Sequence, residues 1–288
     1  MTANLRGSLF MTGSMAGFAV EDAFLKLISQ SMAVGQALVV MGVIGIGVFA
    51  ALALRVGDAP VPRAALTRTM ALRSGFEIVG RLFYALAIAL TPISTASAIL
   101  QATPLVVVLG AGLLFGERVT LGRWALILIG FVGVLVILRP GVSGFSPLSL
   151  LALLAMAGFA GRDLATRAAP LGLSNAQLGV AGYAMLTLSG VIILTVTGGA
   201  ALPDARGVLL ILLASGFGIS AYAALTTAMR SGEVGVVTPF RYTRLVFAMI
   251  FGVVIFGERP DTTTLIGALI IVGCGVVLLA PRRNVRRA

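Results

Sequence analysis

Histidine is absent from this sequence of 288 residues, and cysteine occurs once, as Cys274. Without imidazole there is no Ser–His catalytic pair and no metal site built on histidine. One cysteine within an apolar run forms no intramolecular disulfide, and we expect it to pack inside a helix. The sequence therefore predicts neither a metal site nor a bound cofactor.

Charged residues are also scarce: they make up 11% of the chain, against 59% hydrophobic residues and a mean hydropathy of +1.08. An average soluble domain carries roughly 25% charged residues. So few polar side chains could not cover the surface of a soluble fold of this length. The composition excludes a soluble globular protein and a disordered chain, and it predicts an all-α membrane protein with several spans.

The net charge of +11 comes almost entirely from arginine, since Lys26 is the only lysine. A strongly basic soluble protein would suggest nucleic-acid binding. In a membrane protein, arginines in short loops fix the orientation in the bilayer instead, and four of them end the chain: Arg282, Arg283, Arg286 and Arg287. We expect the lipid bilayer, and not nucleic acid, as the partner of these residues.

Glycine, proline, arginine and aspartate divide the chain into ten apolar runs, each close to the ~20 residues of a membrane helix. The runs lie near 8–29, 33–54, 67–90, 94–115, 120–138, 147–167, 173–196, 207–229, 233–256 and 263–280. The two chain ends and the loops on their side of the membrane together hold twelve basic residues. The loops on the other side hold only Arg139, Arg206 and Arg259. The positive-inside rule therefore predicts both termini in the cytoplasm and a multi-pass protein of a bacterial inner membrane.

An internal repeat relates the two halves at a constant offset of 141 residues. Residues 15–22 align with 156–163, and Gly116-Glu117-Arg118 aligns with Gly257-Glu258-Arg259. We therefore divide the chain into a first five-helix repeat, 1–140, and a second, 141–288. Because five is odd, the copies cross the membrane in opposite directions, an inverted-topology repeat that suits alternating access. The alternative is a duplication without a mechanistic role.

Ionisable residues occur well inside four of the predicted spans, at Glu21, Asp22, Lys26, Glu77, Arg81, Arg162, Asp163, Arg241 and Arg244. Facing lipid near a helix centre, each would cost about 2.5–3.5 kcal/mol on insertion scales. We therefore expect them to face a wet cavity inside the bundle and to pair there. Three pairs have helical spacing of four residues: Asp22 with Lys26, Glu77 with Arg81, and Asp163 with Arg167.

The candidate substrate-binding residues are Asp22, Glu77, Arg81, Gln101, Arg162, Asp163, Arg241, Tyr242 and Arg244. Arginines would hold polar or anionic edges of a small molecule as fixed donors, while the acids orient them or titrate. Thr103-Pro104 and Thr238-Pro239 are candidate hinges, since proline kinks a helix. The alternative is that the charges are structural ion pairs between helices.

Two five-span repeats that each close with an apolar run and Gly-Glu-Arg resemble the EamA type of the drug/metabolite transporter superfamily. This resemblance covers the whole chain. It implies ten transmembrane helices, a small-molecule substrate in a central cavity between the halves, and no ATP-hydrolysing domain.

A finer resemblance concerns residues 16–22, 77–81, 98–104, 161–167 and 239–244, which look like the bacterial riboflavin-transporter branch. It implies riboflavin uptake. Pro239-Phe240-Arg241-Tyr242 is also similar to S-adenosylmethionine uptake relatives. Export of amino acids or other metabolites, a channel, and an acid-based membrane enzyme around Asp22, Glu77 and Asp163 stay open as alternatives. The direction of transport, its energy coupling and a homodimer also stay open.

Overall fold

The computed structural model describes residues 2–115, 120–139, 146–167, 172–231 and 237–279. Within these ranges all regular secondary structure is helical, as predicted. The helices are α1 (Ala3–Ile28), α2 (Val34–Arg55), η1 (Arg63–Leu66), α3 (Arg68–Leu90), α4 (Ile93–Leu100), α5 (Thr103–Phe115), α6 (Leu121–Leu138), α7 (Ser149–Arg167), α8 (Asn175–Thr197), α9 (Ala205–Ser231), η2 (Thr238–Tyr242), α11 (Thr243–Phe256) and α12 (Thr262–Leu279).

Six of these helical segments are long and apolar enough to cross a membrane by length and composition: α2, α4 with α5, α7, α8, α9, and η2 with α11. The apolar stretches of α6 and α12 are shorter, at Trp124–Leu138 and Thr262–Val277. Helices α1 and α3 differ because each carries four charged residues. Much of the ionic chemistry of the protein is therefore concentrated on two helices that hydropathy alone would rank low.

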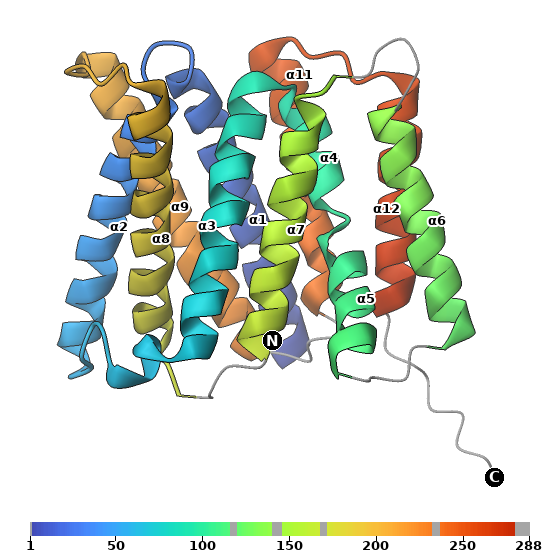
Figure 1. Cartoon of the computed structure of the whole chain (residues 1–288), viewed down its shortest axis with the longest axis horizontal. Helices are drawn as coiled ribbons and strands as arrows, with labels where there is room; N and C mark the ends of the chain where they lie inside the picture. Colours follow the sequence, from blue (N-terminus) through green and yellow to red (C-terminus); the bar gives the residue numbers. More distant parts are fainter. Residues whose placement is uncertain (1, 116–119, 140–145, 168–171, 232–236, 280–288) are drawn as a thin grey trace.

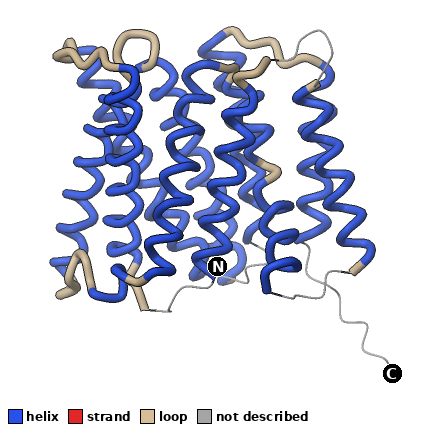
Figure 2. Tube along the Cα trace, in the orientation of Figure 1, coloured by secondary structure: helices blue, strands red, loops and turns tan. Residues whose placement is uncertain are grey.

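The run predicted near 94–115 is two helices, α4 and α5, separated by a turn at Gln101 and Ala102. Figure 2 shows this break as a short loop within the bundle, away from both edges. Pro104 is the second residue of α5, where its missing N–H and fixed φ cost the helix little. The predicted hinge at Thr103-Pro104 therefore coincides with a true interruption of the helix.

Matching helices of the two repeats run in opposite directions (Figure 1). The ribbon of α1 begins at the lower edge and ends at the upper edge, and the ribbon of α7 runs the other way. Helix α1 packs on α9, and their repeat mates α7 and α3 pack on each other in the same way. The mates α2 and α8 pack together, as do α6 and α12. The halves are thus related by a pseudo-two-fold arrangement.

Small residues let α2 and α8 approach closely. A Cβ on Gly35 would come within 2.5 Å of the backbone nitrogen of Leu194, and one on Gly42 would overlap the side chain of Thr187. Helix pairing within lipid depends on such close van der Waals packing. The described residues form two large buried apolar clusters, one around α4, α6 and α12 and the other around α2, α8 and α9, and a smaller third one between α1 and α9.

Candidate functional site

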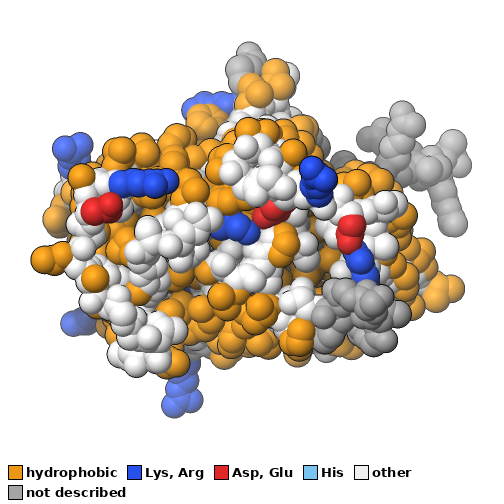
Figure 3. Space-filling model, turned by 90° about the horizontal axis from the view of Figure 1, so that it is seen from above, with side chains coloured by type: hydrophobic (Ala, Val, Ile, Leu, Met, Phe, Trp, Pro, Cys, Tyr) orange, Lys and Arg blue, Asp and Glu red, His pale blue; other side chains and the backbone are white. Residues whose placement is uncertain are grey.

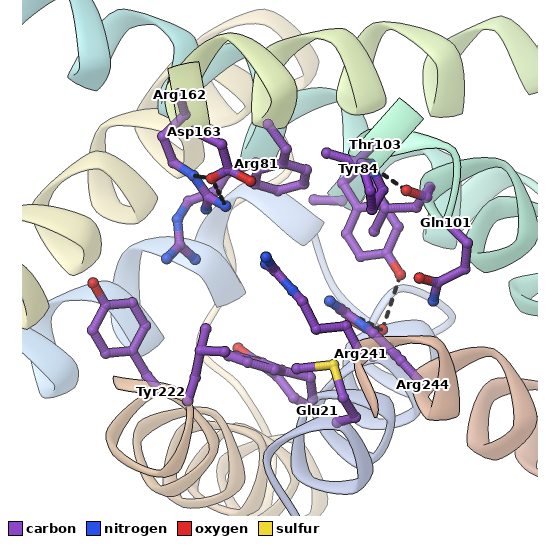
Figure 4. A pocket seen from close by; sticks show the side chains of 18 of the residues that line it. Glu21, Arg81, Tyr84, Gln101, Thr103, Arg162, Asp163, Tyr222, Arg241 and Arg244 are labelled. Atoms are coloured by element: carbon purple, nitrogen blue, oxygen red, sulfur yellow. Dashed lines mark hydrogen bonds and ion pairs between the residues drawn. The ribbon is translucent and has the colours of Figure 1, made fainter. Parts of the chain in front are cut away.

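A cavity of about 250 Å³ lies between the two apolar clusters, among side chains from both repeats. Helices α1, α2, α3, α7, α8 and α9 form its walls together with the broken helix α4–α5 and the segment η2–α11. Seven of the candidate residues line it: Asp22, Arg81, Gln101, Arg162, Asp163, Arg241 and Arg244 (Figure 4). The structure places Glu77 and Tyr242 behind the wall, with exposures of 0% and 4%.

Asp22 and Arg244 form one ionic centre of the cavity. The Nη2 and Nε atoms of Arg244 lie 2.7 and 3.2 Å from Asp22 Oδ2, and the hydroxyl of Tyr84 donates to the same oxygen at 3.0 Å. The guanidinium also lies over the Phe18 ring, 5.2 Å from its centroid. The expected pairing of Asp22 with Lys26 is therefore wrong, because the carboxylate of Asp22 forms its ion pair with Arg244 from the other repeat.

Glu77 is the centre of a second cluster, just outside the cavity. Its carboxylate lies 2.9 Å from Arg73 Nη1, 3.2 Å from Arg81 Nε and 3.9 Å from Arg162 Nη1. The predicted Glu77–Arg81 pair is confirmed. One fully buried carboxylate thus holds arginines of both α3 and α7, and Arg81 and Arg162 extend from it to the cavity wall.

Asp163 pairs with its neighbour on α7, Arg162, whose Nη2 and Nε atoms lie 2.8 and 3.0 Å from Asp163 Oδ1. The guanidinium of Arg162 stacks over Phe159 at 4.9 Å. The predicted partner, Arg167, has a side chain outside the described part of the structure. Asp163 and Arg162 together present a compact ion pair to the cavity.

Arg241 differs from the other cavity arginines. No hydrogen bond or ion pair joins its side chain to any residue that the structure describes. In Figure 4 its guanidinium extends into the middle of the pocket. Its donors are therefore free to bind a molecule that enters the cavity.

Sequence reasoning missed three ionisable residues of the cavity wall: Glu21, Tyr84 and Tyr222. Glu21 was expected to face the interior but was left out of the candidate set. Tyr84 lies one helical turn after Arg81, a spacing that could have indicated it. Tyr222 donates to the carbonyl of Leu178 at 3.1 Å, and nothing in the sequence pattern distinguishes it.

Glu258 connects several helices at the edge of the bundle where α11 ends, which is the upper edge in Figure 1. Gly257 ends α11 with φ of 62°, a left-handed conformation that glycine adopts without strain. The next residue, Glu258, accepts hydrogen bonds from the backbone N–H groups of Ile93 and Ser94 at 2.7 and 3.1 Å. Its carboxylate therefore caps the start of α4, where Pro92 supplies no side-chain cap.

The same carboxylate accepts from the Ser94 hydroxyl at 2.7 Å and pairs with Lys26 Nζ at 3.1 Å. Lys26 also donates to the carbonyl of Thr91 at 2.7 Å. This Glu258 network joins α1, α4 and α11 above the cavity and gives the second Gly-Glu-Arg motif a structural role. On the face seen in Figure 3, each acidic side chain lies near a basic one, and further basic side chains lie at the outline of the molecule without an acidic neighbour.

Replacing Glu258 by glutamine is expected to lower the free energy of unfolding by about 1.5–3 kcal/mol, the range for hydrogen bonds to a charged group. Burial alone would raise the pKa of Glu258, but hydrogen bonds from Ser94, Ile93 and Lys26 bring it below 4.5. The stabilisation is therefore complete above pH 4.5 and is lost as the pH falls through the folded-state pKa.

Unfolding in detergent micelles, followed over a pH series, measures this effect. The exposed neighbour Arg259 provides the control, as Arg259→Ala should leave stability unchanged. Equal stability of Glu258→Gln and the unmutated protein at neutral pH would contradict a role of Glu258 in closing this edge.

Comparison with known proteins shows the family to which the chain belongs. The EamA-like transporter family matches residues 5–139 and, separately, residues 147–280. This protein belongs to the EamA-like transporter family. The resemblance to the drug/metabolite transporter superfamily is confirmed, and the protein is a multi-pass membrane protein of a transporter family with two repeats.

Two relatives are similar over most of their length. An S-adenosylmethionine uptake transporter of Rickettsia bellii is 26% identical over 70% of this chain and 68% of the relative. A riboflavin transporter of Rhizobium johnstonii is 28% identical over 77% of this chain and 71% of the relative. A protein of known crystal structure is 21% identical in sequence, and the match covers 94% of this chain and 95% of that protein's chain. The TM-score is 0.60, so the two share the fold.

Proposed function

We propose that this EamA-like transporter is a secondary transporter that imports riboflavin across a bacterial inner membrane by alternating access. In this proposal ten helical segments cross the bilayer, with α4–α5 and η2–α11 each counted as one. The cavity is the binding site, and the two antiparallel repeats open it first to one side and then to the other. The protein is not an enzyme.

The observation that carries this proposal is the free guanidinium of Arg241 in a cavity shared by both repeats. A purely structural arginine would be paired with an acid, as Arg73, Arg162 and Arg244 are. An uncommitted arginine at the centre of an inverted repeat is what a transporter needs in order to hold a polar molecule between its two halves.

Aromatic rings on several walls support a flavin as the substrate. Phe18, Tyr84, Phe159 and Tyr222 all line the cavity. Flat aromatic molecules stack on such rings, and the carbonyl and imide edge of a flavin matches the donors and acceptors of Arg241 and Gln101. The similarity to riboflavin transporters points the same way.

Charge favours a flavin over S-adenosylmethionine. Five arginines lie in or behind the cavity wall, at positions 73, 81, 162, 241 and 244, against carboxylates at 21, 22, 77 and 163. The positive excess remains even when every acid is ionised. A sulfonium ion would be repelled by this excess, whereas a neutral flavin would not.

The distribution of arginines supports the orientation. Helix directions bring Arg55, Arg63 and Arg68 to the edge where α1 begins, and Arg139, Arg206 and Arg259 to the opposite edge (Figure 1). The first turns of α1 and α6 bring Arg6 and Arg123 to the first edge as well, so that edge faces the cytoplasm by the positive-inside rule.

Uptake of labelled riboflavin by a flavin-auxotrophic bacterium tests the proposal. Expression of the protein is expected to restore growth at low external riboflavin and to give saturable uptake that unlabelled riboflavin competes away. Neither rescue nor uptake, with the protein shown to be in the membrane, would overturn the riboflavin assignment. Uptake of labelled S-adenosylmethionine instead would assign the other substrate.

A further inference from the structure

Glu21 is the exception among the carboxylates of the cavity region. Three of the four have an arginine partner: Asp22 pairs with Arg244, Glu77 with Arg73 and Arg81, and Asp163 with Arg162. Glu21 lines the cavity, and no hydrogen bond or ion pair connects it to any residue in the described ranges. A lone carboxylate in such a place requires an explanation.

The surroundings of Glu21 leave it without a dedicated counter-ion. Its carboxylate lies over Gly218 of α9, where an added Cβ would come within 2.6 Å of Oε1. The titratable and charged groups on the elements around it are Asp22 and Lys26 on α1, Arg81 and Tyr84 on α3, Tyr183 on α8, Tyr222 on α9, Arg241 on η2 and Arg244 on α11. Helix α4 carries no charged residue, and α2 carries only Arg55 at its far end.

Three of the four nearby cations are already engaged, and the fourth, Arg241, forms no ion pair with Glu21 in the described part of the structure. Arg81 is held by Glu77, Arg244 by Asp22, and Lys26 by Glu258. Protonating one of these partnered acids would leave a buried arginine without its counter-ion, at a large cost. Protonating Glu21 breaks no ion pair. Among the four carboxylates, Glu21 therefore binds a proton with the least disruption.

We propose that Glu21 is the proton-binding site that couples transport to a proton gradient, with proton and substrate moving in the same direction. This inference rests on the proposed transport function. The only bond made is O–H on the Glu21 carboxylate: the proton comes from water on the side of entry and returns to water on the side of release. No other covalent bond changes.

Hydration explains why proton and substrate move together. An empty cavity of about 250 Å³ holds several water molecules, which solvate an ionised carboxylate. A substrate that fills the cavity displaces this water, and an ionised Glu21 without a counter-ion then becomes costly. The loaded transporter therefore changes conformation with Glu21 protonated, and the empty transporter returns with Glu21 ionised and hydrated.

Purified protein in liposomes tests this coupling with labelled riboflavin. An inward proton gradient should drive the unmutated protein to accumulate riboflavin above the external concentration. Glu21→Gln, a mimic of the neutral acid, should lose this accumulation but keep exchange of internal for external riboflavin. Asp58→Asn makes the same chemical change in the loop after α2 and should keep both activities.

A second measurement is independent of the substrate. Infrared difference spectra of the purified protein between acid and alkaline pH should contain a carboxyl C=O band that disappears in Glu21→Gln and persists in Asp58→Asn. A band unaffected by Glu21→Gln would overturn the proposal. So would gradient-driven accumulation by that variant, or failure of the unmutated protein to accumulate riboflavin under the gradient although it exchanges riboflavin. Absence of riboflavin exchange with the Glu21 band present would instead reject riboflavin as the substrate.

Discussion

Replacing Arg241 by alanine is expected to abolish riboflavin uptake without lowering the amount of protein in the membrane. The guanidinium makes no ion pair with the described part of the chain, so its removal leaves no buried acid without a partner. A hydrogen bond to a charged group contributes about 1.5–3 kcal/mol, and its loss corresponds to a decrease in affinity of about 10- to 150-fold. Initial uptake rates, normalised to membrane abundance, measure the effect.

Two matched variants test whether the loss of uptake comes from the guanidinium of Arg241. Arg206→Ala removes an exposed arginine from the first turn of α9 and should leave uptake unchanged. Arg241→Lys keeps the charge but loses the planar fork of donors, so it should retain only a small part of the activity. Normal uptake by Arg241→Ala would show that this arginine has no part in binding.

The largest effect on stability is expected at Glu77, where Glu77→Gln should cost about 3–5 kcal/mol, as is typical when a buried ion pair loses one partner. Glu77 is completely buried and is the shared counter-ion of Arg73, Arg81 and, more distantly, Arg162. Without its charge, the arginines of α3 and α7 repel one another around a buried neutral side chain. Unfolding in detergent and abundance in the membrane should both decrease strongly.

Asp163→Asn is the control, because Asp163 is also an acid with an arginine partner but lies at the cavity, with 25% of its side chain exposed. Water can reach Arg162 there, so the loss of stability should be much smaller. Equal destabilisation by both variants would show that Glu77 is not the centre of the cluster. A stable Glu77→Gln protein without transport would instead assign Glu77 to substrate binding.

The interior charges show which ion pairs can be predicted from helical periodicity and which cannot. Spacing along one helix correctly predicted the pairing of Glu77 with Arg81. It failed for Asp22, since the partner that wins, Arg244, lies 222 residues away in sequence. Lys26 pairs instead with Glu258 at the edge of the bundle. Periodicity identifies neighbours on one helix, but it contains no information about which other helix lies opposite.

The sequence by itself determined the membrane class, the positions of the helices, the twofold repeat and the presence of an interior ionic site, because hydropathy, helix-breaking residues and a constant offset can all be read along one dimension. Only the tertiary structure decided that Glu77 lies behind the cavity wall, that Arg241 and Glu21 form no ion pair with the residues it describes, and that Glu258 caps α4. Those outcomes depend on how helices from opposite repeats cross. At the crossing of α1 and α9, for example, the absence of a side chain on Gly218 leaves room for the carboxylate of Glu21.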